Sequence, residues 1–245
     1  MKIHDLHCHI LPGLDDGPYS LEESLQMAFM AAENNTAGLV CTPHYFPVNS
    51  YSRQELFTCY RDFYAAVHDN NIPLHLALGQ EIFLDHTFLR TADMLESGEL
   101  LTLNRSVYPL VEVDPQISAV FACRMLDALI ARGFKPILAH PERYAFICEN
   151  PSILIHMHAE GILLQLNKDS LFGNFGVSAQ QTAHFMLKNR LASFVSSDAH
   201  SPYQRNPQLL TIHEIISEQY SEEYADILFT ENPLCILRNQ EVFHY

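Results

Sequence analysis

The chain has 245 residues, 48% of them apolar, and a formal net charge of −15 at pH 7. This length suits one large domain, so we expect a single domain over residues 1–245. The acidic charge argues against a nucleic-acid surface, which needs stripes of lysine and arginine. No apolar run reaches the roughly 18–20 residues of a membrane span. The opening MKIHDLHCH lacks the apolar stretch of a signal peptide, so we expect a cytoplasmic protein.

Short apolar or β-branched runs alternate with longer helical patterns along the chain. The predicted strands cover residues 2–7, 38–42, 74–79, 107–113, 136–139, 162–166 and 193–196. Ser20-Leu21-Glu22-Glu23 predicts a capping box at the start of a helix, and further helices are predicted over residues 53–70, 115–132, 178–189 and 207–228. This alternation favours an α/β fold with a parallel sheet, and about seven units favour a closed or distorted barrel.

The residues that follow the predicted strands are of the types that bind metal ions. Functional groups in parallel α/β folds gather at the carboxyl ends of the strands. Those ends carry His7, His9, Asp15, Asp16, His44, Glu81, Glu112, His140, Arg143, Asn167, Asp198 and His200. The chain also has 14 histidines, which is well above ordinary usage. Together these observations predict a metal site at one end of the sheet.

The spacing His7-x-His9 has a geometric meaning. On an extended chain, residues i and i+2 share a face, so both imidazoles can reach one ion while Cys8 points away. Asp198-x-His200 repeats this spacing at the last predicted strand. His156 and His158 have the same spacing, but they lie in a stretch that we predict to be helical. Their side chains would diverge there, so we do not expect them to be ligands.

With these residues in place, the chain resembles the PHP (polymerase and histidinol phosphatase) superfamily. It is more closely similar to the CpsB/CapC family of bacterial metal-dependent protein tyrosine phosphatases. The resemblance runs in the family's order from residue 5 to residue 200, through "DLHCHILPGLDDGP", "TPHY", "GQEI", "ILAHPERY", "LLQLNKDSLFG" and "SSDAH". It implies a distorted TIM-like (β/α)7 barrel of the PHP type, three divalent metal ions (commonly manganese) and hydrolysis of phosphotyrosine.

The resemblance also implies a role for each candidate residue. His7, His9, Glu81 and Asp198 would hold one ion, and Glu81 would bridge to a second ion completed by Glu112 and His140. Asp16, His44 and His200 would hold the third ion, with Asp15 as the alternative to Asp16. Arg143 and Arg205 resemble the phosphate-binding arginines of the family, and a guanidinium fork fits phosphate geometry.

The chemistry of this set is consistent with a phosphatase. Five imidazoles and four carboxylates without a thiolate suit Mn²⁺, Fe²⁺ or Zn²⁺. The mechanism predicted is in-line attack of a metal-bound hydroxide on phosphorus, with the ions and arginines stabilising the developing charge. A cysteine-based phosphatase needs an arginine six residues after the nucleophile. None of the six cysteines has one, so that mechanism is excluded.

The substrate and partner follow from the resemblance alone. The expected substrate is a phosphotyrosine protein, and the family's usual partner is a bacterial tyrosine kinase of capsule or exopolysaccharide synthesis. One alternative is a PHP-type phosphatase of a small phosphomonoester such as histidinol phosphate, and another is a non-catalytic metal-binding regulatory protein. The stretch SLEESLQMAFMAAE resembles a helix through which relatives form homo-oligomers, and an amphipathic core helix explains it equally well.

Overall fold

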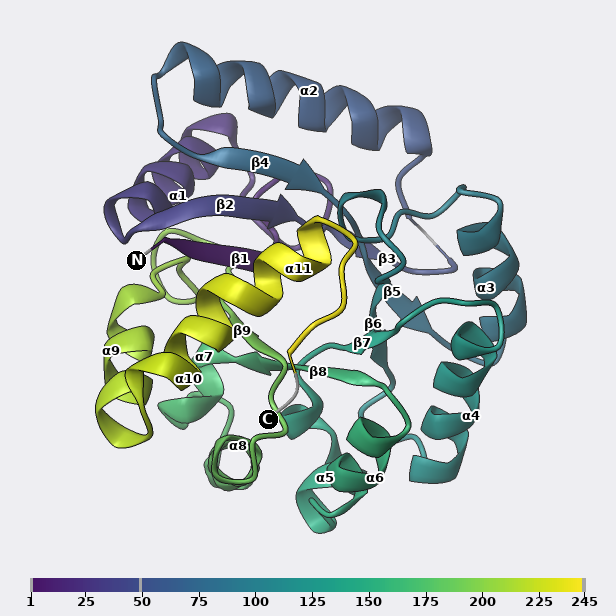
Figure 1. Cartoon of the computed structure of the whole chain (residues 1–245). Helices are drawn as coiled ribbons and strands as arrows, with labels where there is room; N and C mark the ends of the chain where they lie inside the picture. Colours follow the sequence, from purple (N-terminus) through teal and green to yellow (C-terminus); the bar gives the residue numbers. More distant parts are fainter. Residues whose placement is uncertain (1, 49, 244–245) are drawn as a thin grey trace.

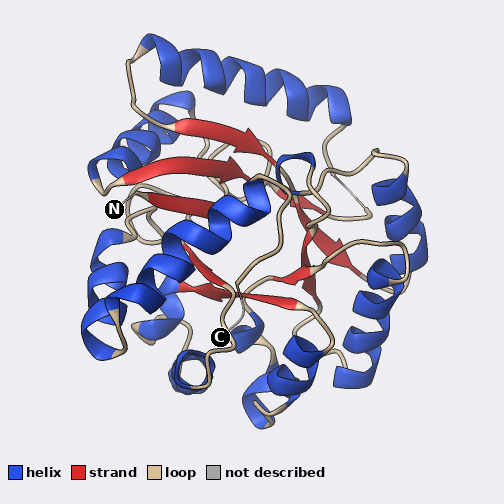
Figure 2. Ribbon diagram, viewed as in Figure 1, coloured by secondary structure: helices blue, strands red, loops and turns tan. Residues whose placement is uncertain are grey.

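The computed structural model describes residues 2–48 and 50–243, and every strand pair in it is parallel. One sheet has the order β1-β2-β4, formed by Ile3–Cys8, Thr36–Cys41 and His75–Leu78. The other has the order β3-β5-β6-β7-β8-β9, formed by His44–Tyr45, Glu81–Leu84, Leu110–Val113, Ile137–Leu138, Leu163–Asn167 and Phe194–Ser196. Helices surround both sheets (Figures 1 and 2).

Backbone contacts join the two sheets into a distorted barrel. Cys8, at the end of β1, forms a parallel bridge with Ala199, just after β9. His9 N donates to Ala199 O at 2.9 Å, and Asp198 N donates to His7 O at 2.9 Å. Because β3 continues the strand position of β2, and β5 continues that of β4, the pairing passes through seven strand positions and returns to β1. The predicted fold class is confirmed.

The second and third strand positions are each interrupted, which the sequence analysis did not predict. The predicted strands 38–42 and 74–79 end where the structure has breaks, at residues 42–43 and 79–80, but the chain then resumes as β3 and β5. Pro43 has no N–H to donate to a ladder at the first break. Beyond the breaks, His44 pairs in register with Glu81. These two candidate ligands therefore begin strands, whereas we expected them in loops.

Most predicted helices are present, with shifted ends. The helical elements are α1 (Leu21–Glu33), α2 (Arg53–Asp69), α3 (Phe88–Glu96), α4 (Ala119–Ile130), α5 (Ala145–Glu149), α6 (Ile153–Ala159), α7 (Lys168–Leu171), α8 (Val177–Lys188), α9 (Leu210–Gln219), α10 (Glu222–Asp226), a π-helical turn (Ile227–Glu231) and α11 (Asn232–Leu237), with short 3₁₀ turns at Leu103–Arg105 and Pro141–Arg143. The prediction of one helix over 207–228 is wrong. Ser221 starts a second helix there, since its side chain accepts a bond from Tyr224 N.

The predicted capping box at Ser20 is only half formed. Ser20 Oγ accepts from Glu23 N at 3.2 Å, but the Glu23 carboxylate accepts from Tyr19 N, one residue before the cap. A complete capping box occurs at the start of α2, between Ser52 and Glu55. Both motifs nevertheless begin a helix at the predicted residue.

The amino end of the barrel is filled by apolar side chains and covered by α11, which crosses the strands in Figure 1. Ile236 of α11 belongs to one buried cluster with residues of six strands, among them Leu6, Val40, Leu110, Ile137, Leu163 and Phe194. Tyr108 Oη, just before β6, donates to Gln240 O at 2.6 Å, which holds the C-terminal segment at this end. The carboxyl end of the barrel is left for polar groups.

No helix among residues 2–48 and 50–243 combines the length and apolar character needed to cross a membrane.

Gly79, at the second strand break, has no room for a side chain. A Cβ at this position would lie 2.8 Å from Leu103 Cδ2 and 3.2 Å from Leu103 Cα. We expect Gly79→Ala to lower the free energy of unfolding by about 1–3 kcal/mol, measured by urea denaturation. Leu103→Ala removes the nearer atom, so the double variant should lose less than the sum of the two single variants. Strict additivity would contradict this explanation.

Candidate metal centre

The structure brings the predicted metal ligands together at the carboxyl end of the barrel. Among the described residues, potential ligand atoms lie within 4.8 Å of one another in three groups: His7, His9, Glu81 and Asp198; His9, Asp16, His44 and His200; and His44, Glu81 and Glu112. His140 lies beside the third group, with Nε2 2.9 Å from Glu81 Oε1 and 4.0 Å from Glu112 Oε2. All nine candidates therefore meet in one region, although they span residues 7 to 200.

The first group is centred on two histidines of one strand end. His7 Nε2 and His9 Nε2 are 3.1 Å apart, and Glu81 Oε2 lies 3.0 and 3.1 Å from them. Asp198 Oδ1 lies 3.4 and 3.6 Å from the same two nitrogens. Cys8 packs on the other side, in the apolar cluster that contains residues of α1 and α2. The prediction that His7 and His9 share a face while Cys8 points away is confirmed.

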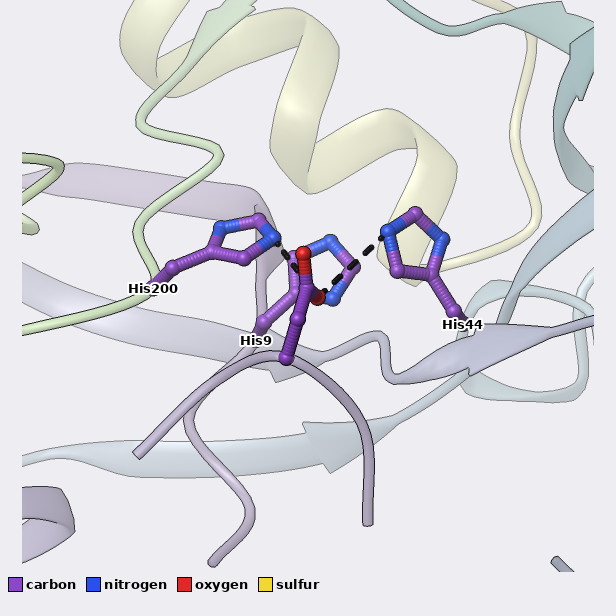
Figure 3. Close-up of side chains that lie close together, drawn as sticks. His9, His44 and His200 are labelled. Carbon is purple, nitrogen blue, oxygen red and sulfur yellow. Dashed lines mark ion pairs between the residues drawn. The ribbon is translucent and has the colours of Figure 1, made fainter. Parts of the chain in front are cut away.

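The second group lies nearer to solvent. Asp16 Oδ1 is 3.2 Å from His200 Nε2 and 3.7 Å from His44 Nε2, and the Asp16 side chain is 63% exposed. Figure 3 shows the imidazoles of His9, His44 and His200 converging from separate segments of the chain. The rings of His9 and His200 are stacked, with centroids 3.9 Å apart.

His44 faces two groups at once. Its Nε2 points toward Asp16, while its Nδ1 lies 3.2 Å from Glu81 Oε2 and 3.1 Å from Glu112 Oε1. The resemblance places His44 with Asp16 and His200 alone. The additional proximity to Glu81 follows from the register of β3 and β5, which sets these two residues side by side.

Electrostatics at this end of the barrel favour positive charge. Glu81 and Asp198 are fully or almost fully buried, which opposes ionisation, but the neighbouring His7 and other cationic groups still lower the pKa of both carboxyls. Burial likewise opposes charge on His7, yet Glu81 and Asp198 raise its pKa, and Asp15 raises the pKa of His9 well above the ordinary value. The same field that stabilises imidazolium would stabilise a divalent cation.

Asp15 and Asp16 have different positions, which the sequence could not separate. The Asp15 carboxylate lies 2.6 Å from His9 Nδ1 and accepts bonds from His44 N at 2.9 Å and Gly17 N at 3.0 Å. It thus leaves His9 Nε2 directed at Glu81 and Asp198. Partners of this kind fix the tautomer and orientation of a ligating histidine. Of the two aspartates, Asp16 is the one whose carboxylate faces the imidazoles of His200 and His44.

Gln165, like Asp15, contacts candidate ligands without facing the cluster itself, and its role was not predicted from the sequence. Its Oε1 lies 3.1 Å from His7 Nδ1 and accepts a bond from His140 N at 2.9 Å. The available signal was a polar residue inside the apolar run LLQLN of β8, where the structure buries it fully. His200 Nδ1, in turn, lies 2.9 Å from the carbonyl oxygen of Asp198.

Glu142, which follows the same predicted strand as His140 but had no predicted role, supports Asp198 indirectly. Asn167 Nδ2 donates to Asp198 Oδ2 at 2.7 Å, and Asn167 N donates to Glu142 Oε1 at 3.0 Å. Ser170 Oγ donates to the same Glu142 oxygen at 2.7 Å. Burial raises the pKa of Glu142, which is entirely shielded from solvent.

The two predicted arginines approach the site from one side. Arg143 Nη1 lies 3.2 Å from Asp198 Oδ2, and Arg205 Nη2 lies 2.6 Å from the same oxygen. Their side chains are 30% and 31% exposed. The structure therefore sets two partly accessible guanidinium groups next to the buried ligand cluster.

Backbone strain accompanies this arrangement. His140 has φ of +34° and Asp198 has φ of +50°, in the left-handed region that residues other than glycine rarely adopt. Each such residue costs of the order of 1–3 kcal/mol, and strain of this kind is concentrated at functional sites. Both residues carry candidate ligand atoms.

The donor set fits divalent cations of the first transition row. It contains five imidazoles and four carboxylates, and neither thiolate nor thioether is among them. Two imidazole nitrogens, His44 Nδ1 and His200 Nε2, are shielded from solvent and lie 3.1–3.2 Å from carboxylate oxygens without hydrogen-bonding geometry. His44 Nδ1 faces the Glu81–Glu112 group and His200 Nε2 faces Asp16, so each is placed to act as a ligand in a different group.

Replacing Asp15 tests whether it orients His9. We expect Asp15→Ala to weaken metal binding about 10–100-fold, because His9 Nδ1 loses its partner. Asp15→Asn keeps an oxygen acceptor and should lose less. Competition against a chromophoric chelator measures the affinity, with Asp62→Ala on the exposed face of α2 as control. Equal losses in the Asp15→Ala and Asp62→Ala variants would refute this role.

The geometry agrees with comparisons to known proteins. A family model described as capsular polysaccharide synthesis, CpsB/CapC, matches residues 3–238. Tyrosine-protein phosphatase YwqE of Bacillus subtilis is 32% identical over 98% of this chain and 93% of its own length. Tyrosine-protein phosphatase CpsB of Streptococcus pneumoniae is 29% identical over 96% of this chain and 98% of its own.

Solved structures extend this likeness to the fold. A chain from the crystal structures of YwqE from Bacillus subtilis and CpsB from Streptococcus pneumoniae, described as unique metal-dependent tyrosine phosphatases, superposes with a TM-score of 0.91. The two sequences are 31% identical, and the superposition covers 99% of this chain and 97% of the other chain. A phosphotriesterase homology protein from Escherichia coli, at 10% identity and a TM-score of 0.61, shares the fold alone. The chain belongs to the CpsB/CapC family of capsular polysaccharide synthesis.

Proposed function

We propose that the chain is a single-domain, manganese-dependent protein tyrosine phosphatase. The observation that carries this proposal is the convergence of nine candidate metal ligands beside two partly exposed arginines. Relatives named tyrosine-protein phosphatases, one of them in a structure described as metal-dependent, support it. A cytoplasmic location goes with this proposal.

The proposal assigns the ligands to three ions. His7, His9, Glu81 and Asp198 hold the first, Glu81 with Glu112 and His140 holds the second, and Asp16, His44 and His200 hold the third. Manganese suits a mixed set of imidazoles and carboxylates, as do iron and zinc. Such ions activate water as a nucleophile near neutral pH and neutralise charge on a phosphoryl group.

Arg143 and Arg205 bind the phosphate in this proposal. Each guanidinium now donates to Asp198 Oδ2 and keeps part of its surface in solvent. Guanidinium groups match the geometry of phosphate oxygens and stay charged at all physiological pH values. Placed beside the ligand cluster, they hold a phosphate dianion in position and stabilise the charge that develops on it.

The proposed substrate is a phosphotyrosine on a protein, and the proposed partner is a bacterial tyrosine kinase of capsule or exopolysaccharide synthesis. Two exposed aromatic residues lie beside the site. Phe46 is 39% exposed and packs on His44 with ring centroids 5.1 Å apart, and Tyr203 is 69% exposed and lines a pocket together with Asp16, His200 and Arg205. Aromatic surfaces of this kind suit an aryl phosphate that protrudes from a polypeptide.

Metal removal tests the central claim. Chelator-treated protein should lose hydrolysis of p-nitrophenyl phosphate, and added Mn²⁺ should restore it. His140→Ala should reduce kcat/KM more than about 100-fold, since even partners of ligands cost about 10–100-fold. His156→Ala replaces an exposed histidine on α6 and serves as the matched control. Equal activity of metal-free and Mn-loaded protein would contradict the proposal.

A substrate panel tests the choice of substrate. Mn-loaded protein should have a higher kcat/KM for a phosphotyrosyl peptide than for a phosphoseryl peptide of the same sequence or for histidinol phosphate. A preference for histidinol phosphate would instead support a small-molecule phosphatase. Failure of the intact, metal-loaded protein to hydrolyse any of them would favour a regulatory metal-binding role.

A further inference from the structure

A phenylalanine outside the proposed ligand and phosphate-binding sets lies against both arginines. The guanidinium carbon of Arg143 is 4.3 Å from the centroid of the Phe175 ring, and that of Arg205 is 5.9 Å from it. Both distances are within the range of cation–π attraction, which is about 6 Å.

The loop that carries Phe175 has a defined backbone. It covers residues 172–176 between α7 and α8, and its two glycines, Gly173 and Gly176, have φ of +79° and +93°. Gly176 N donates to Gly173 O at 2.9 Å, and Asn174 N donates to Asp169 O at 3.2 Å. Because these bonds and glycine conformations fix the turn, the Phe175 ring is presented in one place rather than on a free loop.

The Phe175 ring offsets the repulsion between the two guanidinium groups. Arg143 and Arg205 both donate to one oxygen, Asp198 Oδ2, so two positive groups are brought close together. The face of an aromatic ring is negative and attracts both cations without competing for their N–H donors. Each guanidinium donates to Asp198 Oδ2 through a single nitrogen, so further N–H groups remain available for a phosphate oxygen.

We propose that Phe175 is a positioning residue that holds Arg143 and Arg205 together at the phosphate site. This role rests on the proposed function, because it acts only through phosphate-binding arginines. Phe175 therefore sets how strongly the arginines bind the phosphate group, to the same extent in the bound substrate and in the transition state, so its loss raises KM and leaves kcat nearly unchanged.

The test compares substitutions at Phe175 in the Mn-loaded full chain. With Phe175→Leu, KM for p-nitrophenyl phosphate and Ki for inorganic phosphate should rise about five- to tenfold, while kcat changes less than about twofold. Phe175→Tyr keeps an aromatic face and should restore both constants. Phe172→Leu is the matched control, since Phe172 lies on the same loop, is 49% exposed and has no arginine stacked on it among the described residues.

A double-mutant cycle with Arg143→Lys tests whether Phe175 changes Ki through the arginines. If Phe175 acts through the arginines, the double variant should raise Ki less than the product of the two single effects. Independent, multiplicative effects would overturn the inference, and so would an unchanged Ki in Phe175→Leu beside a raised Ki in Arg143→Lys. Both results leave the proposed phosphatase intact.

Failure of the wild-type protein to hydrolyse phosphate esters would instead refute the proposed function and this inference with it. Metal content and thermal unfolding of each variant show that the site and the fold are retained.

Discussion

The structure depends on one buried carboxylate, that of Glu81. It is shielded from solvent, and nitrogens of His7, His9, His44 and His140 lie 2.9–3.2 Å from its two oxygens. A buried carboxylate is costly unless positive charge surrounds it, so the fold must bring cationic or metal-binding groups to this point from several strands. The interrupted strands meet that requirement, because they set β3 and β5 in the register that places His44 beside Glu81.

The barrel separates stability from chemistry along its axis. Its amino end contains the apolar cluster that includes Leu6, Phe194 and Ile236, and α11 covers it. Its carboxyl end contains strained backbone at His140 and Asp198, together with several buried carboxyl groups. Apolar packing at the amino end stabilises the fold and so offsets the cost of strained backbone and buried carboxyl groups at the carboxyl end.

Sequence reasoning predicted the parts of this protein that depend on residue type and local spacing. The seven strand positions follow from apolar runs, and the shared face of His7 and His9 follows from the period of an extended chain. Three features were out of reach because they depend on tertiary contacts. The break at Gly79 reflects the approach of Leu103, the roles of Asp15 and Asp16 depend on where a turn is placed, and Gln165 is identified only by its partners His7 and His140. The end of α9 at Gln219 and the start of α10 after Ser221 also escaped prediction, since the apolar pattern continues across the break.

Asp198 joins two parts of the site through its two oxygens. Oδ1 faces the imidazoles of His7 and His9, while Oδ2 accepts bonds from Arg143, Arg205 and Asn167. A cation bound at Oδ1 would draw negative charge from the carboxylate, so Oδ2 would accept hydrogen bonds less strongly. In the proposed function, cation binding at Asp198 Oδ1 and anion binding by the arginines are therefore thermodynamically linked through this carboxylate. Linkage is reciprocal, so each ligand changes the affinity for the other by the same factor.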